Sequence, residues 1–264
     1  MKFKHLLLTL AAAAWGVQSA SAATITALYD AGGAYLGNAA QVGYEAGTVS
    51  PGPNGAPSAY VGIGGNAFTA TPDGSFGLPS GHFDAWCVDI LHWLATPSSL
   101  FNVKTGAALA GTLTTIRPGT PDGTQRLADL DRLADLYYDS LNTKTESAAF
   151  QLAVWAITYG SKGANGYEIN STDANFRVDA GTAISAWGVQ ANQWLDGVAS
   201  NAVATSNYNI IYLEDASAGA NKTQDMVVFV KSSASTNNVP EPGSLALVGL
   251  ALVGVGATLR RRKA

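Results

Sequence analysis

Two kinds of hydrophobic pattern occur along the chain. Short β-favouring runs, bounded in the first part of the chain by Pro- and Gly-rich turns, predict strands at 24–29, 59–63, 208–213 and 225–231. A period of 3.6 residues predicts helices at 122–141, 143–160 and 182–200. The helices thus occupy the middle of the chain, with strands before and after them. This order predicts an α+β fold, in which a β-rich domain carries a central helical subdomain.

The helix predicted at 143–160 contains one polar side chain where its pattern calls for an apolar one. Thr143 followed by Glu146 is typical of a capping box, and Gly160 lies where the helix should end. Between them, Gln151 is surrounded by apolar residues. A buried carboxamide without a partner costs about 1 to 3 kcal/mol. Gln151 is therefore either hydrogen-bonded for structural reasons or present for chemistry.

Further helices are predicted before and after this one, and an apolar segment precedes all three. Asp122, three residues before Gln125, predicts the start of the preceding helix, and Ile184 and Trp187 belong to the apolar face of the helix predicted at 182–200. The segment 83–94 is also apolar, and the four residues 86–89, Trp-Cys-Val-Asp, have the composition of a buried strand.

Both ends of the chain have the composition of targeting signals. Residues 1–22 combine a basic start, an apolar run and a small-residue cleavage site, which predicts a signal peptide. Near the other end, Pro240-Glu241-Pro242 precedes 17 uncharged residues, 243–259, and the basic cluster Arg260, Arg261 and Arg262. Such a run is just long enough to cross a bilayer at 1.5 Å per residue, and the basic cluster would stay cytoplasmic. We therefore expect a single transmembrane helix, preceded by a polar linker at 232–238.

This tail resembles the PEP-CTERM sorting signal, in which a Pro-Glu-Pro motif precedes a short transmembrane helix and an Arg cluster. The resemblance covers residues 239–264 and implies an exosortase-type membrane enzyme as partner. It also implies export, anchoring in the inner membrane before processing, and a final place at the cell surface or in the extracellular matrix. The alternative is a plain C-terminal membrane anchor.

Charge and cysteine content narrow the function of the region between the signals. From 23 to 239 the chain has 9 basic and 18 acidic residues, a balance that gives no electrostatic reason to bind nucleic acid. Cys87 is the single cysteine, so an intramolecular disulfide is impossible. The simplest interpretation is that Cys87 fills a core, since free cysteines are among the most buried residues.

The neighbourhoods of Cys87 and Gln151 together resemble the thioester domain of bacterial surface adhesins. The resemblance spans 83–159 and rests on Trp86-Cys87-Val88-Asp89 and on the segment from Phe150 to Trp155. It implies that the Cys87 sulfur displaces ammonia from the Gln151 side chain and leaves a thioester that attacks an amine- or hydroxyl-bearing partner. Trp86, Asp89, Phe150 and Trp155 would then support the bond, and Phe83 would help to exclude water. The sequence departs from the family at Trp86, where Tyr, Phe or Leu is commoner, and at Ala149, where a hydroxyl is usual.

These patterns predict an extracellular domain at 23–231 that acts in adhesion or biofilm assembly. The competing interpretation is a non-covalent structural protein of the exopolysaccharide matrix with an inert buried cysteine. The sequence has no Gly-x-Ser-x-Gly turn, phosphate-binding loop or zinc spacing. We therefore expect no enzyme activity, no metal and no cofactor.

Overall fold

The computed structural model describes residues 24–29, 43–71, 82–94, 98–201, 207–217, 219 and 222–232. The predicted signal peptide, the linker beyond residue 232 and the predicted transmembrane helix lie outside these ranges. No helix within them is long and apolar enough to cross a membrane.

Eight strands are formed by the described residues, and every pairing between them is antiparallel. They are β1 (Thr24–Tyr29), β2 (Gly43–Ser50), β3 (Ala59–Thr71), β4 (His82–Cys87), β5 (Ser98–Lys104), β6 (Arg177–Val178), β7 (Tyr208–Asp215) and β8 (Met226–Lys231). Their order is β1-β5-β7-β8-β4-β3-β2-β6, and β1 also pairs with β3. The extra pairing closes six of the strands into a ring. Outside the ring, β2 pairs with the first half of β3, and the short β6 pairs with the end of β2.

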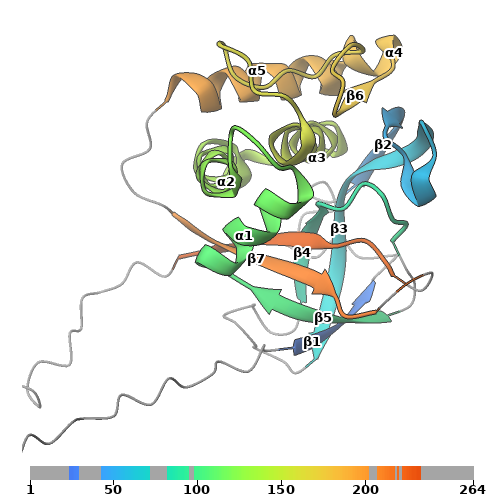
Figure 1. Cartoon of the computed structure of the whole chain (residues 1–264), viewed down its shortest axis with the longest axis vertical. Helices are drawn as coiled ribbons and strands as arrows, with labels where there is room; N and C mark the ends of the chain where they lie inside the picture. The colour runs from blue at the N-terminus through green and yellow to red at the C-terminus, as the bar shows by residue number, and fades with distance from the viewer. Residues whose placement is uncertain are drawn as a thin grey trace, which may run out of the picture.

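The helices pack on one side of this sheet, as Figure 1 shows. They are α1 (Gly106–Ile116), α2 (Gly123–Tyr137), α3 (Lys144–Tyr159), α4 (Ala180–Ala183) and α5 (Ala186–Ser200), with short 3₁₀ turns at Pro53–Gly55 and Tyr138–Ser140. The central helix α3 contacts β2, β3 and β4 on one side and α2 and α5 on others. The predicted α+β class is therefore confirmed. Helix α1 and strands β2, β5 and β6 were absent from the prediction.

Strand β4 contributes side chains to two separate hydrophobic cores. Phe83 and Ala85 belong to a core inside the ring of strands, together with residues such as Phe68 and Phe101. Trp86 belongs to the larger core between the sheet and the helices. Side chains of successive strand residues point to opposite faces, which places Ala85 in one core and Trp86 in the other. Cys87, the last residue of β4, departs from this alternation and also belongs to the larger core.

The predicted ends of the two long central helices are confirmed. Asp122 caps α2, with the reciprocal bond from the Asp122 backbone N–H to the Gln125 side chain, and Thr143 caps α3. Glu146 differs slightly from the expected capping box, because its carboxylate accepts from the backbone N–H of Asn142. Gly160 caps the C-terminal end of α3, as predicted, and its backbone N–H donates to the Ala156 carbonyl.

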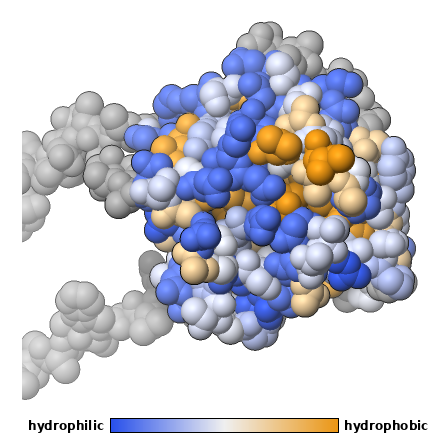
Figure 2. Space-filling view, turned by 90° about the horizontal axis from the view of Figure 1, so that it is seen from above, coloured by the Kyte–Doolittle hydropathy of each residue, from blue (hydrophilic) through white to orange (hydrophobic). Residues whose placement is uncertain are grey.

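The helix predicted at 182–200 is wrong in its first turn. The chain forms the short α4, breaks, and starts α5 at Ala186, where the Ser185 side chain accepts from the backbone N–H of Gly188. This break leaves Ile184, which we expected on the apolar face, 79% exposed. Seen from the helical end, the surface is mostly hydrophilic with small apolar patches (Figure 2).

Candidate functional site

The site begins where strands β3 and β4 separate. Their ladder ends at the pair Asn66 and Ala85, whereas β4 remains paired with β8 as far as Cys87 and Met226. If the register continued, Gly64 would lie opposite Cys87. The strands instead diverge, so the edge of Cys87 that faces β3 has no strand partner for its backbone N–H and C=O.

The side chain of Gln151, from the middle of α3, takes the place of that missing partner. Its Oε1 accepts a hydrogen bond from the Cys87 backbone N–H at 2.9 Å, and its Nε2 donates to the Cys87 carbonyl at 2.7 Å. Gln151 is fully buried and Cys87 is 5% exposed. The carboxamide is thus fixed in orientation against the residue that carries the thiol.

A second polar side chain of α3, one turn earlier, fixes β3 in the same way. The Ser147 hydroxyl accepts from the backbone N–H of Gly65 at 2.8 Å, and Ser147 is fully buried. A side chain at Gly65 would meet the Trp86 indole, because an added Cβ would lie 2.9 Å from the ring. Ser147 and Gln151 therefore join α3 to both of the diverging strands.

The space between the diverging strands is a cavity of about 340 Å³. Its walls are made by residues from β2, β3, α3 and the loops after β4 and before β8. Those used below are Asn66, Cys87, His92, Trp93, Gln151 and Gln224. The Trp93 side chain is exposed, and that of His92 is 30% exposed, so the cavity reaches the surface. A small molecule or a partner's side chain can thus approach the Cys87–Gln151 pair.

The electrostatic surroundings of Cys87 favour the neutral thiol. Burial, followed by the negative charge of Asp89, raises the pKa of the thiol to about 12. The Asn66 Nδ2 lies 3.9 Å from the sulfur, at the outer limit for a hydrogen bond to sulfur. Because the free thiolate is disfavoured, attack on the carboxamide requires the proton to leave the sulfur as the new bond forms.

The carboxamide is arranged to accept such an attack. A thiol that adds to its carbonyl carbon places negative charge on Oε1, and the Cys87 N–H already donates to that oxygen. The nitrogen that would leave as ammonia is held by the Cys87 carbonyl. Holding the carboxamide against the main chain of residue 87 would remove part of the entropic cost of bringing a thiol and an amide together.

The residues expected to support the pair have different places in the structure. Trp155 lines the cavity. Trp86 and Phe150 lie behind it, in edge-to-face contact with ring centroids 5.2 Å apart. Phe83 is on the other face of the sheet, inside the ring of strands, so its expected place in a shell around the thiol is wrong. The cause is the strand period, which turns Phe83 away from the face that bears Trp86.

Asp89 lies outside β4, although the sequence suggested a strand through residue 89. The strand ends at Cys87, and Asp89 begins a turn in which its Oδ1 accepts from the Leu91 backbone N–H at 2.9 Å. Its Oδ2 is 2.5 Å from His92 Nδ1. Sequence reasoning did not select Asn66, His92 or Trp93 for the site. Only the spacing of Asp89 and His92, three residues apart, gave a signal that the two belong together.

Comparisons with known proteins bear on the C-terminal tail. Residues 238–263 match the PEP-CTERM protein-sorting motif. The chain carries an exosortase sorting signal. The predicted position, 239–264, differs from the match by one residue at each end. The motif marks an exported protein that is anchored in a membrane before an exosortase processes it. The residues of the motif, including Glu241 and the Arg cluster, lie outside the described residues.

The part of the chain before the tail was also compared with curated proteins and with solved structures. No curated protein matches the sequence. Among solved structures, the N-terminal domain of the Streptococcus pyogenes pilus tip adhesin Cpa is similar, with a TM-score of 0.43 and 11% sequence identity. The similarity covers 81% of this chain and 96% of that one.

Across the described residues, no group of three or more His, Cys, Asp or Glu side chains is placed to hold a metal ion.

Proposed function

We propose that this exported protein attaches covalently to a partner at the cell surface or in the extracellular matrix, through a thioester between Cys87 and Gln151. Its role would be in adhesion or biofilm assembly. One observation carries the proposal: the buried Gln151 carboxamide is bound to the main chain of Cys87 inside a cavity that reaches the surface.

Formation of the thioester would release one molecule of ammonia and need no other reactant. The Cys87 sulfur adds to the side-chain carbonyl carbon of Gln151, the C–N bond breaks, and the thiol proton leaves with the nitrogen as ammonia. An amine or hydroxyl of the partner then replaces the sulfur, and the thiol is regenerated. Each molecule would react once, so the protein would act as an attachment module and not as an enzyme.

The experiment is intact mass spectrometry of the full exported chain. A thioester makes the mass about 17 Da lower than its sequence gives between the observed termini. Added methylamine should bring the mass to about 14 Da above the sequence value and free Cys87 for alkylation. The Cys87→Ala and Gln151→Ala variants should show the full sequence mass and no adduct. A wild-type chain at full mass that does not react with methylamine would refute the proposal.

A second candidate is the non-covalent matrix protein with a spectator cysteine. Two observations favour it. Both polar atoms of the Gln151 carboxamide already have hydrogen-bond partners, as a structural glutamine requires, and burial keeps the Cys87 thiol protonated. This protein would show full mass and one cysteine that is alkylated only after unfolding, so the same measurement separates the two candidates.

A further inference from the structure

The cavity beside Cys87 contains a histidine that the thioester itself does not use. His92 Nδ1 lies 2.5 Å from Asp89 Oδ2, and the same carboxylate accepts from the Leu91 N–H through its other oxygen. Opposite a carboxylate, Nδ1 of a neutral imidazole carries the proton, which leaves Nε2 as the atom able to accept one. His92 lines the cavity with Cys87 and Gln151, so a proton acceptor shares the space with the reacting atoms.

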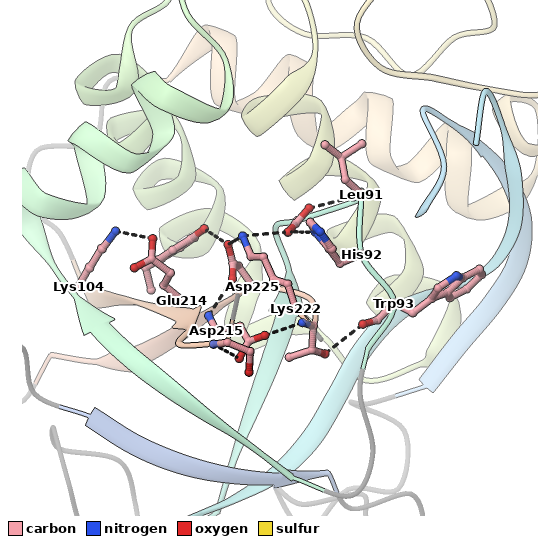
Figure 3. Close-up of polar contacts among 12 residues, drawn as sticks. Leu91, His92, Trp93, Lys104, Glu214, Asp215, Lys222 and Asp225 are labelled. Atoms are coloured by element: carbon pink, nitrogen blue, oxygen red, sulfur yellow. Dashed lines mark hydrogen bonds and ion pairs between the residues drawn. The ribbon is translucent and has the colours of Figure 1, made fainter. Parts of the chain in front are cut away.

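The turn that carries His92 is fixed on both sides of the histidine. The backbone N–H of Asn54 donates to the Leu91 carbonyl at 2.7 Å. The Trp93 carbonyl accepts from the Thr223 hydroxyl at 3.0 Å and from the Gln224 N–H at 3.2 Å (Figure 3). These bonds come from two other parts of the chain, the segment after β2 and the segment before β8. The imidazole is thus held in place before any partner arrives.

The carboxylate of Asp89, which bonds His92, also has a positively charged neighbour. Lys222 Nζ lies 3.6 Å from Asp89 Oδ2 and 3.2 Å from Asp225 Oδ2 (Figure 3). Asp225 in turn accepts from the Tyr212 hydroxyl at 2.8 Å. A carboxylate supported in this way can orient an imidazole and stabilise the positive charge that appears on it when it takes a proton.

We propose that His92, oriented by Asp89, is a general base that directs the Cys87–Gln151 bond toward hydroxyl acceptors. The inference rests on the proposed thioester. The acceptor O–H attacks the Gln151 acyl carbon and its proton passes to His92. The C–S bond breaks, and the proton is then delivered to the departing Cys87 sulfur. The products are an ester on residue 151 and a free thiol, with no other reactant required.

The chemistry of the acceptor explains why a base selects hydroxyls. An unprotonated amine attacks with its own lone pair and needs little help at the first step. A hydroxyl is neutral and weakly nucleophilic, so it gains most when a base removes its proton during attack. Burial also disfavours the free thiolate of Cys87, so proton return through His92 assists the second half of the step. The exposed indole of Trp93, 51% accessible at the cavity, offers an apolar surface for the carbon skeleton of such an acceptor.

The test compares glycerol and methylamine as acceptors for the full exported chain of the wild type and of His92→Gln. Mass spectrometry follows each adduct over time, at about 75 Da above the sequence mass for glycerol and about 14 Da above it for methylamine. In His92→Gln the rate with glycerol should fall about 100-fold, while the rate with methylamine stays within about threefold of wild type. Asp89→Asn should show the same selectivity with a smaller loss.

Gln193→Ala is the control, because Gln193 is exposed on α5 and does not line the cavity. It should leave both rates within about threefold of wild type. Equal rates with glycerol in wild type and His92→Gln would overturn the inference while the methylamine adduct upheld the thioester. Loss of both adducts in His92→Gln, or loss of its initial mass deficit, would overturn it as well, since His92 would then serve formation of the bond. A wild type at full mass that does not react with methylamine refutes both proposals.

Discussion

Gln151 binds Cys87 through the main chain of the cysteine, and not through its sulfur. Both hydrogen bonds of the carboxamide go to the backbone N–H and C=O of residue 87. The contact is therefore independent of the side chain at position 87. It follows that the two residues of the pair should differ in what their removal costs the fold.

We predict that Cys87→Ala lowers the free energy of unfolding by about 1 kcal/mol for the small buried side chain, and by a further amount for the cross-link where the thioester has formed. Gln151→Ala made in that Cys87→Ala background should cost a further 2 to 4 kcal/mol, roughly, because it leaves a buried backbone N–H and C=O without partners. Urea unfolding of the single and double variants measures both steps. The Cys87→Ala background removes the thioester from the comparison. A second step below about 0.5 kcal/mol would contradict the structural role of the carboxamide.

Ser147 should be needed for both stability and chemistry. Ser147→Ala leaves the buried N–H of Gly65 without its acceptor, which should lower the free energy of unfolding by about 1 to 3 kcal/mol. Because this bond holds β3 against α3, its loss should also reduce the fraction of molecules that show the mass deficit of a thioester. Ser140→Ala, at an exposed position, is the control and should change neither quantity. Unchanged unfolding in Ser147→Ala would remove Ser147 from the account of the site.

The sequence predicted the central helices better than the position of the site residues. The capping residues Asp122 and Thr143 marked two helix starts correctly, because a cap is a local interaction between residues three apart. The first turn of the third helix was wrong, since the apolar period ran on through Ile184 and Ser185 was not recognised as a new cap. Local patterns thus fixed most ends, and failed where two caps competed.

Strand pairing lies beyond what a local pattern contains. The cavity lies where the β3–β4 ladder stops at Asn66 and Ala85 and side chains of α3 bind the main chains of both strands. For the same reason the sequence did not assign Asn66 and His92 to the site. Their positions beside Cys87 depend on how distant parts of the chain come together. Gln151 was selected because a polar residue in a fully apolar helix is a local anomaly. The contact between Gln151 and Cys87, which are 64 residues apart, was predicted from the family resemblance and not from periodicity.

Asp84 should make the fold less stable as the pH rises toward neutrality. This residue of β4 is 3% exposed, and within the described residues neither of its carboxylate oxygens has a hydrogen-bond partner. Burial raises the pKa of Asp84 to about 7, from 3.8. Between these values the folded protein holds a proton that the unfolded chain has lost, so stability falls with increasing pH across this window.

The measurement is the free energy of unfolding of wild type and Asp84→Asn from about pH 4 to pH 8. The asparagine has nearly the same shape and does not ionise. Near pH 4 the two proteins should be similar, and above pH 7 the variant should be more stable by at most about 4 kcal/mol. The difference between the two curves isolates the titration of this one group. A constant difference at all pH values would contradict the raised pKa of Asp84.

The sorting tail should act after export and separately from the folded domain. The PEP-CTERM match at 238–263 contains Glu241 and the cluster Arg260, Arg261 and Arg262, while the predicted signal peptide is at the opposite end of the chain. A signal peptide directs translocation as the chain emerges, whereas a basic cluster after a hydrophobic run stops the tail in the membrane. We therefore expect Glu241→Ala to leave export intact and to prevent processing. The unprocessed chain should collect in the membrane fraction with the C-terminus given by its gene.

Replacing Arg260, Arg261 and Arg262 together by Ala should also prevent normal processing, by removing the cytoplasmic charges that hold the tail in place. Cell fractionation, with the C-terminal mass of the purified protein, measures both effects. Ser233→Ala, in the predicted linker outside the matched segment, is the matched control and should be processed like wild type. If the Glu241 and Arg variants kept the wild-type location and mature C-terminus, exosortase processing of this tail would be contradicted. The thioester prediction would be untouched, because the mass deficit arises from Cys87 and Gln151 in the folded domain and not from the tail.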